Sequence, residues 1–202
     1  MKFGKEIKIN ILLVGGTGFI GSNLFDYLRN KYNVFSSTRN ENVMNENYVY
    51  VDFNKPDSFK NIFKKIKKID ILIFLIGLAH EKGKKSDKEE FIATNFNTFI
   101  NLINYIESNQ VLPQKLIYIS TISVYGEKLK TDIYDENMKP EPTSPYAISK
   151  YMTEKYLYEN YEGSFWILRL APVYSDNFIL NINRRTKICL LYTSPSPRDK
   201  RQ

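Results

Sequence analysis

This chain of 202 residues has little of several features that would define a class of protein by themselves. One cysteine, Cys189, leaves no disulfide framework within the chain, which favours a reducing compartment. The N-terminus lacks the apolar segment of a signal peptide. The longest apolar stretch, residues 69–79, is interrupted by Asp70 and is too short to span a bilayer. We therefore expect a cytoplasmic protein with no membrane partner.

The formal net charge of +7 raises the question of a polyanionic partner. The lysines, however, lie in amphipathic segments such as residues 59–68, where they alternate with apolar side chains. A solvated helix face explains this pattern better than a polyanion site does. The sequence therefore predicts no nucleic-acid partner, and we also expect no metal site.

The C-terminal tail has an unusual composition. Residues 189–199 match, residue for residue, the translation of a transposase adapter used to prepare sequencing libraries. The alternative is a genuine basic tail rich in proline and serine. We predict that residues 189–202 are translated adapter sequence and disordered, and that residues 1–188 form the folded part.

Strand-like and helix-like segments alternate along the rest of the chain. This alternation predicts an α/β fold with a doubly wound parallel sheet, whose ligands lie at the carboxyl ends of the strands. A polar connection covers residues 121–144. The expected strands are residues 7–14, 32–37, 48–51, 70–76, 115–120 and 165–170, and the expected helices are residues 18–30, 56–68, 86–109 and 145–162.

Helical spacing also predicts which side chains face the core. In the first helix they are Phe19, Ile20, Leu24, Tyr27 and Leu28. In the long helix they are Phe91, Ile92, Phe96, Phe99, Ile100, Ile103 and Ile106.

A glycine-rich turn follows the first expected strand. Gly15, Gly18 and Gly21 recur at three-residue spacing and lead into the first helix. Glycines let the backbone approach a pyrophosphate closely, and the helix N-terminus directs N–H groups and a positive dipole end at the anion. The alternative is a turn that only packs strand on helix. Because a strand precedes it and a helix follows it, we predict dinucleotide binding here.

The end of the second strand is the usual place for a residue that reads the adenosine ribose. No acid is present at residues 36–39, and Arg39 suits the 2′-phosphate of NADP, although an ordinary loop arginine is the alternative. NAD and NADP therefore both stay open, with a slight preference for NADP. Asp52, after the third strand, is expected to accept a hydrogen bond from the adenine or to cap the helix near Pro56.

Tyr146 and Lys150 are four residues apart on an expected helix, so their side chains share a face. Lowering the pKa of a phenol from about 10 to about 7 requires ~4 kcal/mol of preferential stabilisation of the phenolate. A cation ~4 Å away at an effective dielectric constant near 20 supplies roughly that amount. The pair is therefore expected to serve as an acid/base tyrosine and its lysine.

Thr121 and Ser123 follow the fifth strand. A hydroxyl there can hydrogen-bond a reacting oxygen and share its proton with Tyr146. The alternative is a pair of strand-end hydroxyls that satisfy the local backbone.

Together these motifs resemble the extended short-chain dehydrogenase/reductase family, in its NAD-dependent epimerase/dehydratase, nucleotide-sugar branch. The resemblance spans about residues 7–180. The motifs that carry it, besides the glycine turn and the Tyr–Lys pair, are Asp52-Phe53, residues 75–79, Asn95, residues 120–126 and residues 169–174.

The resemblance implies a catalytic set of Thr121, Tyr146 and Lys150, a substrate contact at Ser123, and Asn95 as a brace of the site. It also implies that Leu75, Ile76 and Gly77 lie along the cofactor, with Leu170, Pro172 and Val173 near the nicotinamide. The full expected cofactor set is Gly15, Thr17, Gly18, Phe19, Ile20, Gly21, Arg39, Asp52, Phe53, Leu75, Ile76, Gly77, Asn95, Tyr146, Lys150, Pro172 and Val173.

Sequence details narrow the reaction. The 4,6-dehydratases of the family carry Asp-Glu directly after the catalytic threonine, whereas Ile122-Ser123 stand here, which argues against dehydration. An epimerase and a 4-keto-sugar reductase both stay open, and residues 77–80 and Arg39 look slightly more like a reductase. His80, the only histidine, is expected to be a substrate contact or an ordinary loop residue.

Two further hypotheses about the function stay open. One is a reductase of another small carbonyl compound, and the other is a non-catalytic sensor or scaffold that binds NAD(P). Family members continue into a smaller C-terminal region that binds the nucleotide sugar, so residues 1–188 are expected to be a truncated NAD(P)-binding Rossmann domain. Both an active and an inactive truncated domain stay open. The expected partners are a nucleotide-sugar substrate and a second copy of the chain, in a homodimer that forms through helices 86–109 and 145–162.

Overall fold

The computed structural model describes residues 9–42, 45–78, 88–126 and 134–174. His80 and residues 189–202 lie outside the described residues, so the predictions made for them stay predictions. The chain divides into two compact units, residues 1–170 and residues 171–202, and the description below concerns the first.

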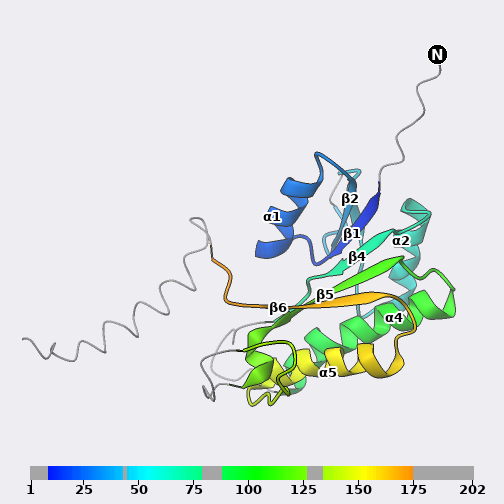
Figure 1. Cartoon of the computed structure of the whole chain (residues 1–202). Coiled ribbons are helices and arrows are strands. Elements are labelled where there is room, and N and C mark those ends of the chain that lie inside the picture. Colours follow the sequence, from blue (N-terminus) through cyan, green and yellow to red (C-terminus); the bar gives the residue numbers. More distant parts are fainter. Residues whose placement is uncertain (1–8, 43–44, 79–87, 127–133, 175–202) are drawn as a thin grey trace, which may run out of the picture. The chain divides into compact units, whose positions relative to one another are not determined.

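The first unit is built on one parallel sheet of six strands in the order β3-β2-β1-β4-β5-β6 (Figure 1). The chain winds outward from β1 in one direction and then from β4 in the other, which confirms the doubly wound fold and puts the crevice at the carboxyl ends of β1 and β4. The strands are β1 (Asn10–Val14), β2 (Asn33–Thr38), β3 (Tyr48–Tyr50), β4 (Ile71–Phe74), β5 (Lys115–Thr121) and β6 (Phe165–Leu170).

Helices pack against both faces of the sheet (Figure 1). Helix α1 packs on one face, and α2, α4 and α5 pack on the other. The helical elements are α1 (Phe19–Leu28), η1 (Pro56–Phe59), α2 (Lys60–Lys65), α3 (Lys88–Phe91), the π-helix η2 (Ile92–Asn97), α4 (Thr98–Ser108), η3 (Ile122–Tyr125) and α5 (Pro145–Asn160). No described helix is long and apolar enough to cross a membrane.

Alternation along the strands divides the core in two. In β1, Ile11 and Leu13 face α1, whereas Leu12 and Val14 join the larger core under α2, α4 and α5. All four side chains are buried, because a central parallel strand is covered on both faces.

Two predicted helix faces require correction. In α1, Tyr27 is 68% exposed and Phe25 is buried instead. The reason is that Gly21 packs directly on Gly16, which turns the Gly21–Phe25 side of the helix toward the sheet. Residues 86–109 are not one uniform α-helix, because their described part, from Lys88 on, contains the π-helix η2. This change of register brings Asn95 into the interior, fully buried.

Candidate active site

The glycine turn between β1 and α1 has no room for side chains at three of its positions. Gly15 has a φ of +88°, a conformation that side-chain-bearing residues rarely adopt. A Cβ at Gly16 would lie 2.3 Å from Ser36 Oγ, and one at Gly21 would lie 2.5 Å from Gly16 Cα. The backbone of the turn is therefore packed tightly against both β2 and α1.

The turn opens directly into the N-terminus of α1. Gly18 is the N-cap of that helix, and neither a side-chain cap nor an acidic residue is present in its first turn. The Gly15 N–H donates to Ser37 Oγ at 3.0 Å, which ties the turn to β2. Thr17 and Gly18 are exposed, and Phe19 and Ile20 are half-buried. An anion could therefore approach both the turn and the positive end of the helix dipole.

Residues 75–77, which follow β4, connect this turn to α5. A Cβ at Gly15 would lie 3.0 Å from the Ile76 backbone nitrogen, and one at Gly77 would lie 3.1 Å from Lys150 Nζ. Leu75 N–H donates to the Val14 carbonyl at 2.8 Å. The structure thus places the glycine turn, residues 75–77 and Lys150 in continuous contact across the crevice.

Lys150 is buried, with its ammonium at the ends of two strands. Nζ donates to the carbonyls of Ile119 (2.8 Å) and Ile76 (3.2 Å) and lies 4.8 Å from the centre of the Tyr118 ring. Burial lowers the pKa of Lys150 to about 7, and the negative charge of Glu154 acts in the opposite direction. The two carbonyls and the aromatic ring hold the Lys150 amino group at this position, and none of the three carries a full negative charge.

Tyr146 lies one helical turn before Lys150, beside the end of β5. Burial raises the pKa of Tyr146, and a hydrogen bond with the Thr121 side chain acts in the opposite direction. Desolvation of the phenolate is the larger of these two causes, and the expected lowering by Lys150 stays a prediction. Thr121 and Ser123 share two hydrogen bonds of 3.2 Å, one from hydroxyl to hydroxyl and one from the Ser123 N–H to the Thr121 hydroxyl.

Asn95 joins two parts of the site. Its amide oxygen accepts from Leu78 N–H (2.6 Å), and its amide nitrogen donates to the Leu78 carbonyl (3.1 Å) and to Ser149 Oγ (2.8 Å). Ser149 lies next to Lys150 on α5. Asn95 therefore holds the segment after β4 against α5, and its expected role as a brace of the active site stays a prediction.

The residues expected near the adenosine end differ in placement. Arg39 follows β2 and is exposed. Asp52 does not cap η1, whose N-cap is Lys55; its carboxylate accepts from Asn54 N–H (3.0 Å) and lies 3.5 Å from Lys55 Nζ. The ring of Phe53 is buried in the core, so only the backbone of that residue is available to a ligand.

Pro172 and Val173 belong to the second compact unit, and their expected contact with the cofactor stays a prediction. Leu170, at the end of β6, is half-buried.

Sequence analysis missed three polar residues that the structure places around this site. They are Ser37, which binds Gly15 N–H; Ser149, which binds Asn95; and Glu154, which is fully buried. Ser149 and Glu154 follow Tyr146 at i+3 and i+8, so the helical face of the Tyr–Lys pair was a signal that could have identified them. The described residues contain no group of three or more side chains suited to a metal ion.

The residues present fit a dinucleotide. A closely packed glycine turn at a helix N-terminus suits a pyrophosphate, and the buried Lys150 and the half-buried Tyr146 lie further along the same crevice. A dinucleotide laid from one to the other would follow the carboxyl ends of β1 and β4.

Solved structures share this fold. The chain is similar to the UDP-glucose 4-epimerase of Thermotoga maritima crystallised with UDP-glucose, with a TM-score of 0.71 and 29% identity over 83% of this chain and 57% of that one. It is also similar to the UDP-glucuronic acid 4-epimerase of Bacillus cereus in complex with NAD, with a TM-score of 0.63 and 25% identity over 80% of this chain and 56% of that one.

Curated relatives are similar in sequence over part of their length. The mouse dTDP-D-glucose 4,6-dehydratase is 31% identical over 69% of this chain and 42% of its own length. The GDP-6-deoxy-D-talose 4-dehydrogenase of Aggregatibacter actinomycetemcomitans is 29% identical over 70% of this chain and 45% of its own length. The chain spans about half the length of the curated relatives it matches. The model of the NAD dependent epimerase/dehydratase family matches residues 11–190, and the chain belongs to that family.

Proposed function

We propose that this chain carries the cofactor-binding and catalytic part of an enzyme that transfers hydride at a hydroxyl-bearing carbon of a nucleotide sugar. An epimerase and a 4-keto-sugar reductase are the two forms of that activity that we consider. The observation that carries the proposal is the continuous contact from the glycine turn through Ile76 and Gly77 to Lys150. The proteins similar in sequence or structure are enzymes named for nucleotide-sugar substrates.

Binding uses the backbone at one end of the crevice and side chains at the other. The glycine turn and the N-terminus of α1 hold the pyrophosphate, and Lys150 binds the ribose next to the nicotinamide. When bound, the nicotinamide supplies the hydride acceptor or donor. Lys150 already donates to two carbonyls, which fixes the direction in which its remaining N–H points.

Tyr146 transfers the proton to or from the reacting oxygen of the sugar. Because burial raises its pKa, the phenol keeps its proton at neutral pH and is ready to donate it to a substrate carbonyl oxygen. Removing a proton from a substrate hydroxyl requires positive charge near the phenolate, and Lys150 is one helical turn away. In this proposal Thr121 orients the reacting oxygen, and its side chain acts against the raised pKa of Tyr146.

The residues after Thr121 favour these reactions over dehydration. Ile122 is 41% exposed, and Ser123 shares hydrogen bonds with Thr121. Neither side chain is a carboxylic acid that could remove a proton from a sugar carbon and protonate the leaving hydroxyl. We therefore propose that the reaction differs from that of the related 4,6-dehydratases.

NADP is the preferred cofactor in this proposal. Arg39 is exposed at the end of β2. The carboxylate closest to it in sequence, Glu41, is hydrogen-bonded to the Tyr50 hydroxyl, which raises the pKa of that phenol. An arginine without a competing ribose-binding acid suits a 2′-phosphate.

The test begins with fluorescence titration of the chain with NADH and NADPH. We expect both to bind, NADPH more tightly, and an Arg39→Ala variant to lose that preference. Lys150→Met should weaken binding of both, whereas Lys155→Met, an exposed position on the same helix, should not. Failure of the chain to bind either cofactor would contradict the proposed function.

Reaction type is tested with nucleotide sugars and cofactor together. A reductase consumes one NADPH for each 4-keto sugar reduced, whereas an epimerase interconverts two sugars without net change in the cofactor. Tyr146→Phe should abolish either reaction, and Tyr158→Phe, 69% exposed on the same helix, is the matched control. Turnover that survives Tyr146→Phe would remove the proton-transfer role.

A further inference from the structure

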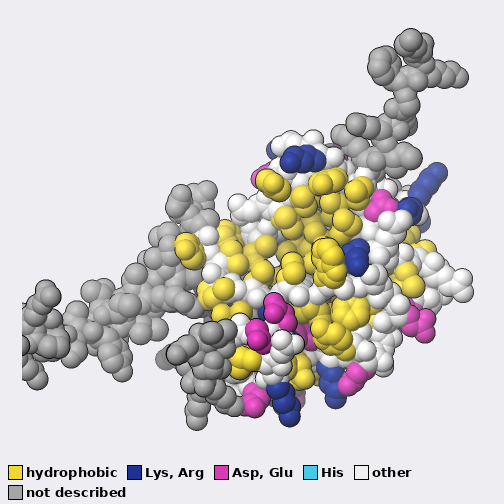
Figure 2. Space-filling model, viewed as in Figure 1, with side chains coloured by type: hydrophobic (Ala, Val, Ile, Leu, Met, Phe, Trp, Pro, Cys, Tyr) yellow, Lys and Arg dark blue, Asp and Glu magenta, His cyan; other side chains and the backbone are white. Residues whose placement is uncertain are grey.

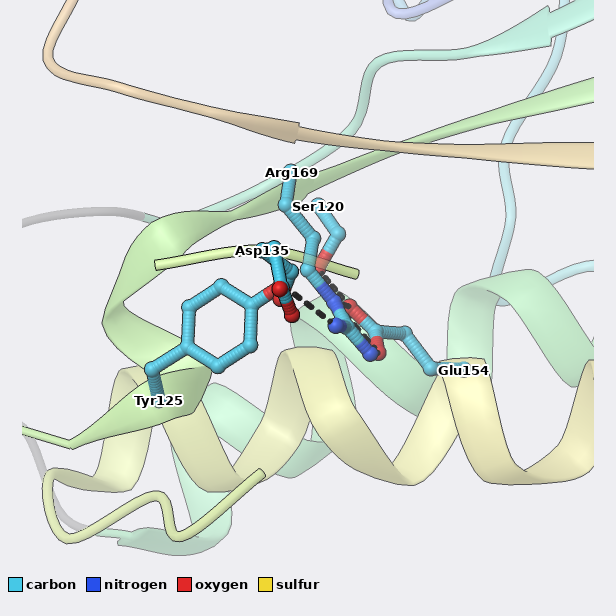
Figure 3. Close-up of polar contacts among 5 residues, drawn as sticks. All are labelled: Ser120, Tyr125, Asp135, Glu154 and Arg169. Carbon is cyan, nitrogen blue, oxygen red and sulfur yellow. Dashed lines mark hydrogen bonds and ion pairs between the residues drawn. The ribbon is translucent and has the colours of Figure 1, made fainter. Parts of the chain in front are cut away.

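An ion pair joins Glu154 on α5 to the half-buried Arg169 on β6 (Figure 3). The Glu154 side chain is fully buried, and its carboxylate accepts from Arg169 Nη2 (2.6 Å) and from Arg169 Nε (3.1 and 3.2 Å). The Ser120 hydroxyl also donates to Glu154. Side chains on β5 and β6 therefore donate directed hydrogen bonds to Glu154 on α5, and these bonds fix the positions of both charges.

The position of this pair relates it to the proposed catalytic residues. Glu154 lies one helical turn after Lys150 on α5. Ser120 lies between Ile119, whose carbonyl binds Lys150, and Thr121. The hydrogen bond from Ser120 to Glu154 therefore joins α5 to β5 at the place where their proposed catalytic side chains meet.

Arg169 extends the connection to a third segment. It lies opposite Ser120 in the pairing of β5 with β6. Its Nη1 donates to the Tyr125 hydroxyl at 2.8 Å, and its guanidinium lies 4.9 Å from the centre of that ring. The Tyr125 hydroxyl in turn donates to the carbonyl of Asp135 at 2.7 Å, as Figure 3 shows.

Residues 135–141 are consequently attached to η3 at both ends. Asp135 is bound by Tyr125, and Glu141 N–H donates to the Val124 carbonyl at 2.9 Å. Between them, the Asp135 carboxylate accepts from Asn137 N–H at 2.9 Å, which closes a turn. This segment leads into the N-terminus of α5, where Tyr146 lies.

We propose that Glu154 and Arg169 are positioning residues for this site. Glu154 fixes α5 against the end of β5, so that Tyr146 meets Thr121 and Lys150 meets the Ile119 carbonyl. Arg169 acts through Tyr125 to hold residues 135–141 in the same arrangement. The proposal rests on the proposed function. A buried ion pair is weak evidence for stability, because desolvation offsets its attraction, whereas its directed hydrogen bonds specify one geometry.

The decisive variant removes both charges while keeping the volume, Glu154→Met/Arg169→Met. Replacing a buried pair by apolar side chains often leaves stability unchanged. We therefore expect a melting temperature close to that of the wild-type chain but NADH binding about tenfold weaker, equivalent to roughly one charge-assisted hydrogen bond. Lys155→Met/Glu159→Met removes an exposed pair on the same helix and should change neither quantity. Wild-type NADH binding in the buried double variant would overturn the proposal.

A second measurement does not depend on cofactor binding and keeps the ion pair. Tyr125→Phe removes only the hydroxyl between Arg169 and Asp135. We expect amide hydrogen exchange to become about tenfold faster at residues 135–141, with little change in β1 and β4. Unchanged exchange at residues 135–141 would overturn the positioning role of Arg169, even where the double variant fails to fold. A wild-type chain that binds neither NADH nor NADPH would contradict the proposed function instead.

Discussion

The two faces of the sheet differ in what covers them. On one face, α2, α4 and α5 bury a continuous core in which Phe74, Phe99 and Tyr118 pack ring against ring, with Phe74 and Phe99 edge-on at 5.0 Å. On the other face, α1 covers the first strands, but in the described part of the chain Trp166 is 59% and Leu168 is 41% exposed on β6. Figure 2 shows hydrophobic side chains gathered over the strands between α1 and α5.

This difference extends to the candidate site. The α1 side contributes backbone, because the glycine turn excludes side chains. The other side contributes buried polar side chains, with Asn95, Ser149, Lys150 and Glu154 all between α5, η2 and the strand ends. Burying such groups is costly unless each finds a partner, so the well-packed face is the one that can hold them in place.

The largest expected effect lies on the well-packed face. Phe74→Ala removes a fully buried ring from contact with Phe53, Phe99 and Tyr118, and should lower the free energy of unfolding by about 3–5 kcal/mol. Urea denaturation measures this loss. Tyr27→Ala, on the exposed side of α1, is the control and should cost little. Equal losses in the two variants would remove the distinction between the faces.

On the α1 face, backbone packing should matter more than side chains. In Gly21→Ala the new Cβ would lie 2.5 Å from Gly16 Cα and 2.6 Å from the Gly15 carbonyl oxygen. We expect a loss of about 2–3 kcal/mol, since backbone on both sides of the contact must move. Gly18→Ala is the matched control, because its Cβ would meet only the Gly15 oxygen, at 3.4 Å. Thermal unfolding that ranks the two variants the other way would show that the turn is loose.

We expect Lys150 to give stability a pH dependence of intermediate size. Its pKa is about 7 in the folded chain and about 10.4 when unfolded, so between these values the unfolded chain binds more protons. Stability of the ligand-free chain should therefore rise with pH, by about 1 kcal/mol more than in Lys150→Met between pH 7 and pH 8. Denaturation at several pH values measures the difference. A rise that is identical in wild type and Lys150→Met would show that Lys150 titrates normally.

The smallest expected effect is on the uncovered strand. Trp166→Ser removes a largely exposed ring, and the Lys115 ammonium lies 5.0 Å from the centre of that ring. The free energy of unfolding should change by less than about 0.5 kcal/mol. A loss as large as that of Phe74→Ala would mean that Trp166 is covered in solution, and that the two faces are equivalent.

Much of the fold could be predicted from local pattern. The six apolar segments predicted as strands are the six strands of the parallel sheet, and the glycine spacing correctly located the turn between β1 and α1. Strands can be predicted from apolar runs because a buried parallel strand is apolar on both faces. Helix faces were harder, as Tyr27 and the π-helix show, because the register of a helix depends on what it packs against.

The sequence by itself determined the order of the elements, the glycine cradle and the pairing of Tyr146 with Lys150 on one helical face, since each depends on spacing along the chain. Only the tertiary structure decided that Lys150 donates to Ile76 and Ile119, that burial raises the pKa of Tyr146, and that Glu154 meets Arg169. Those properties depend on burial and on contacts between residues far apart in sequence, which spacing does not encode.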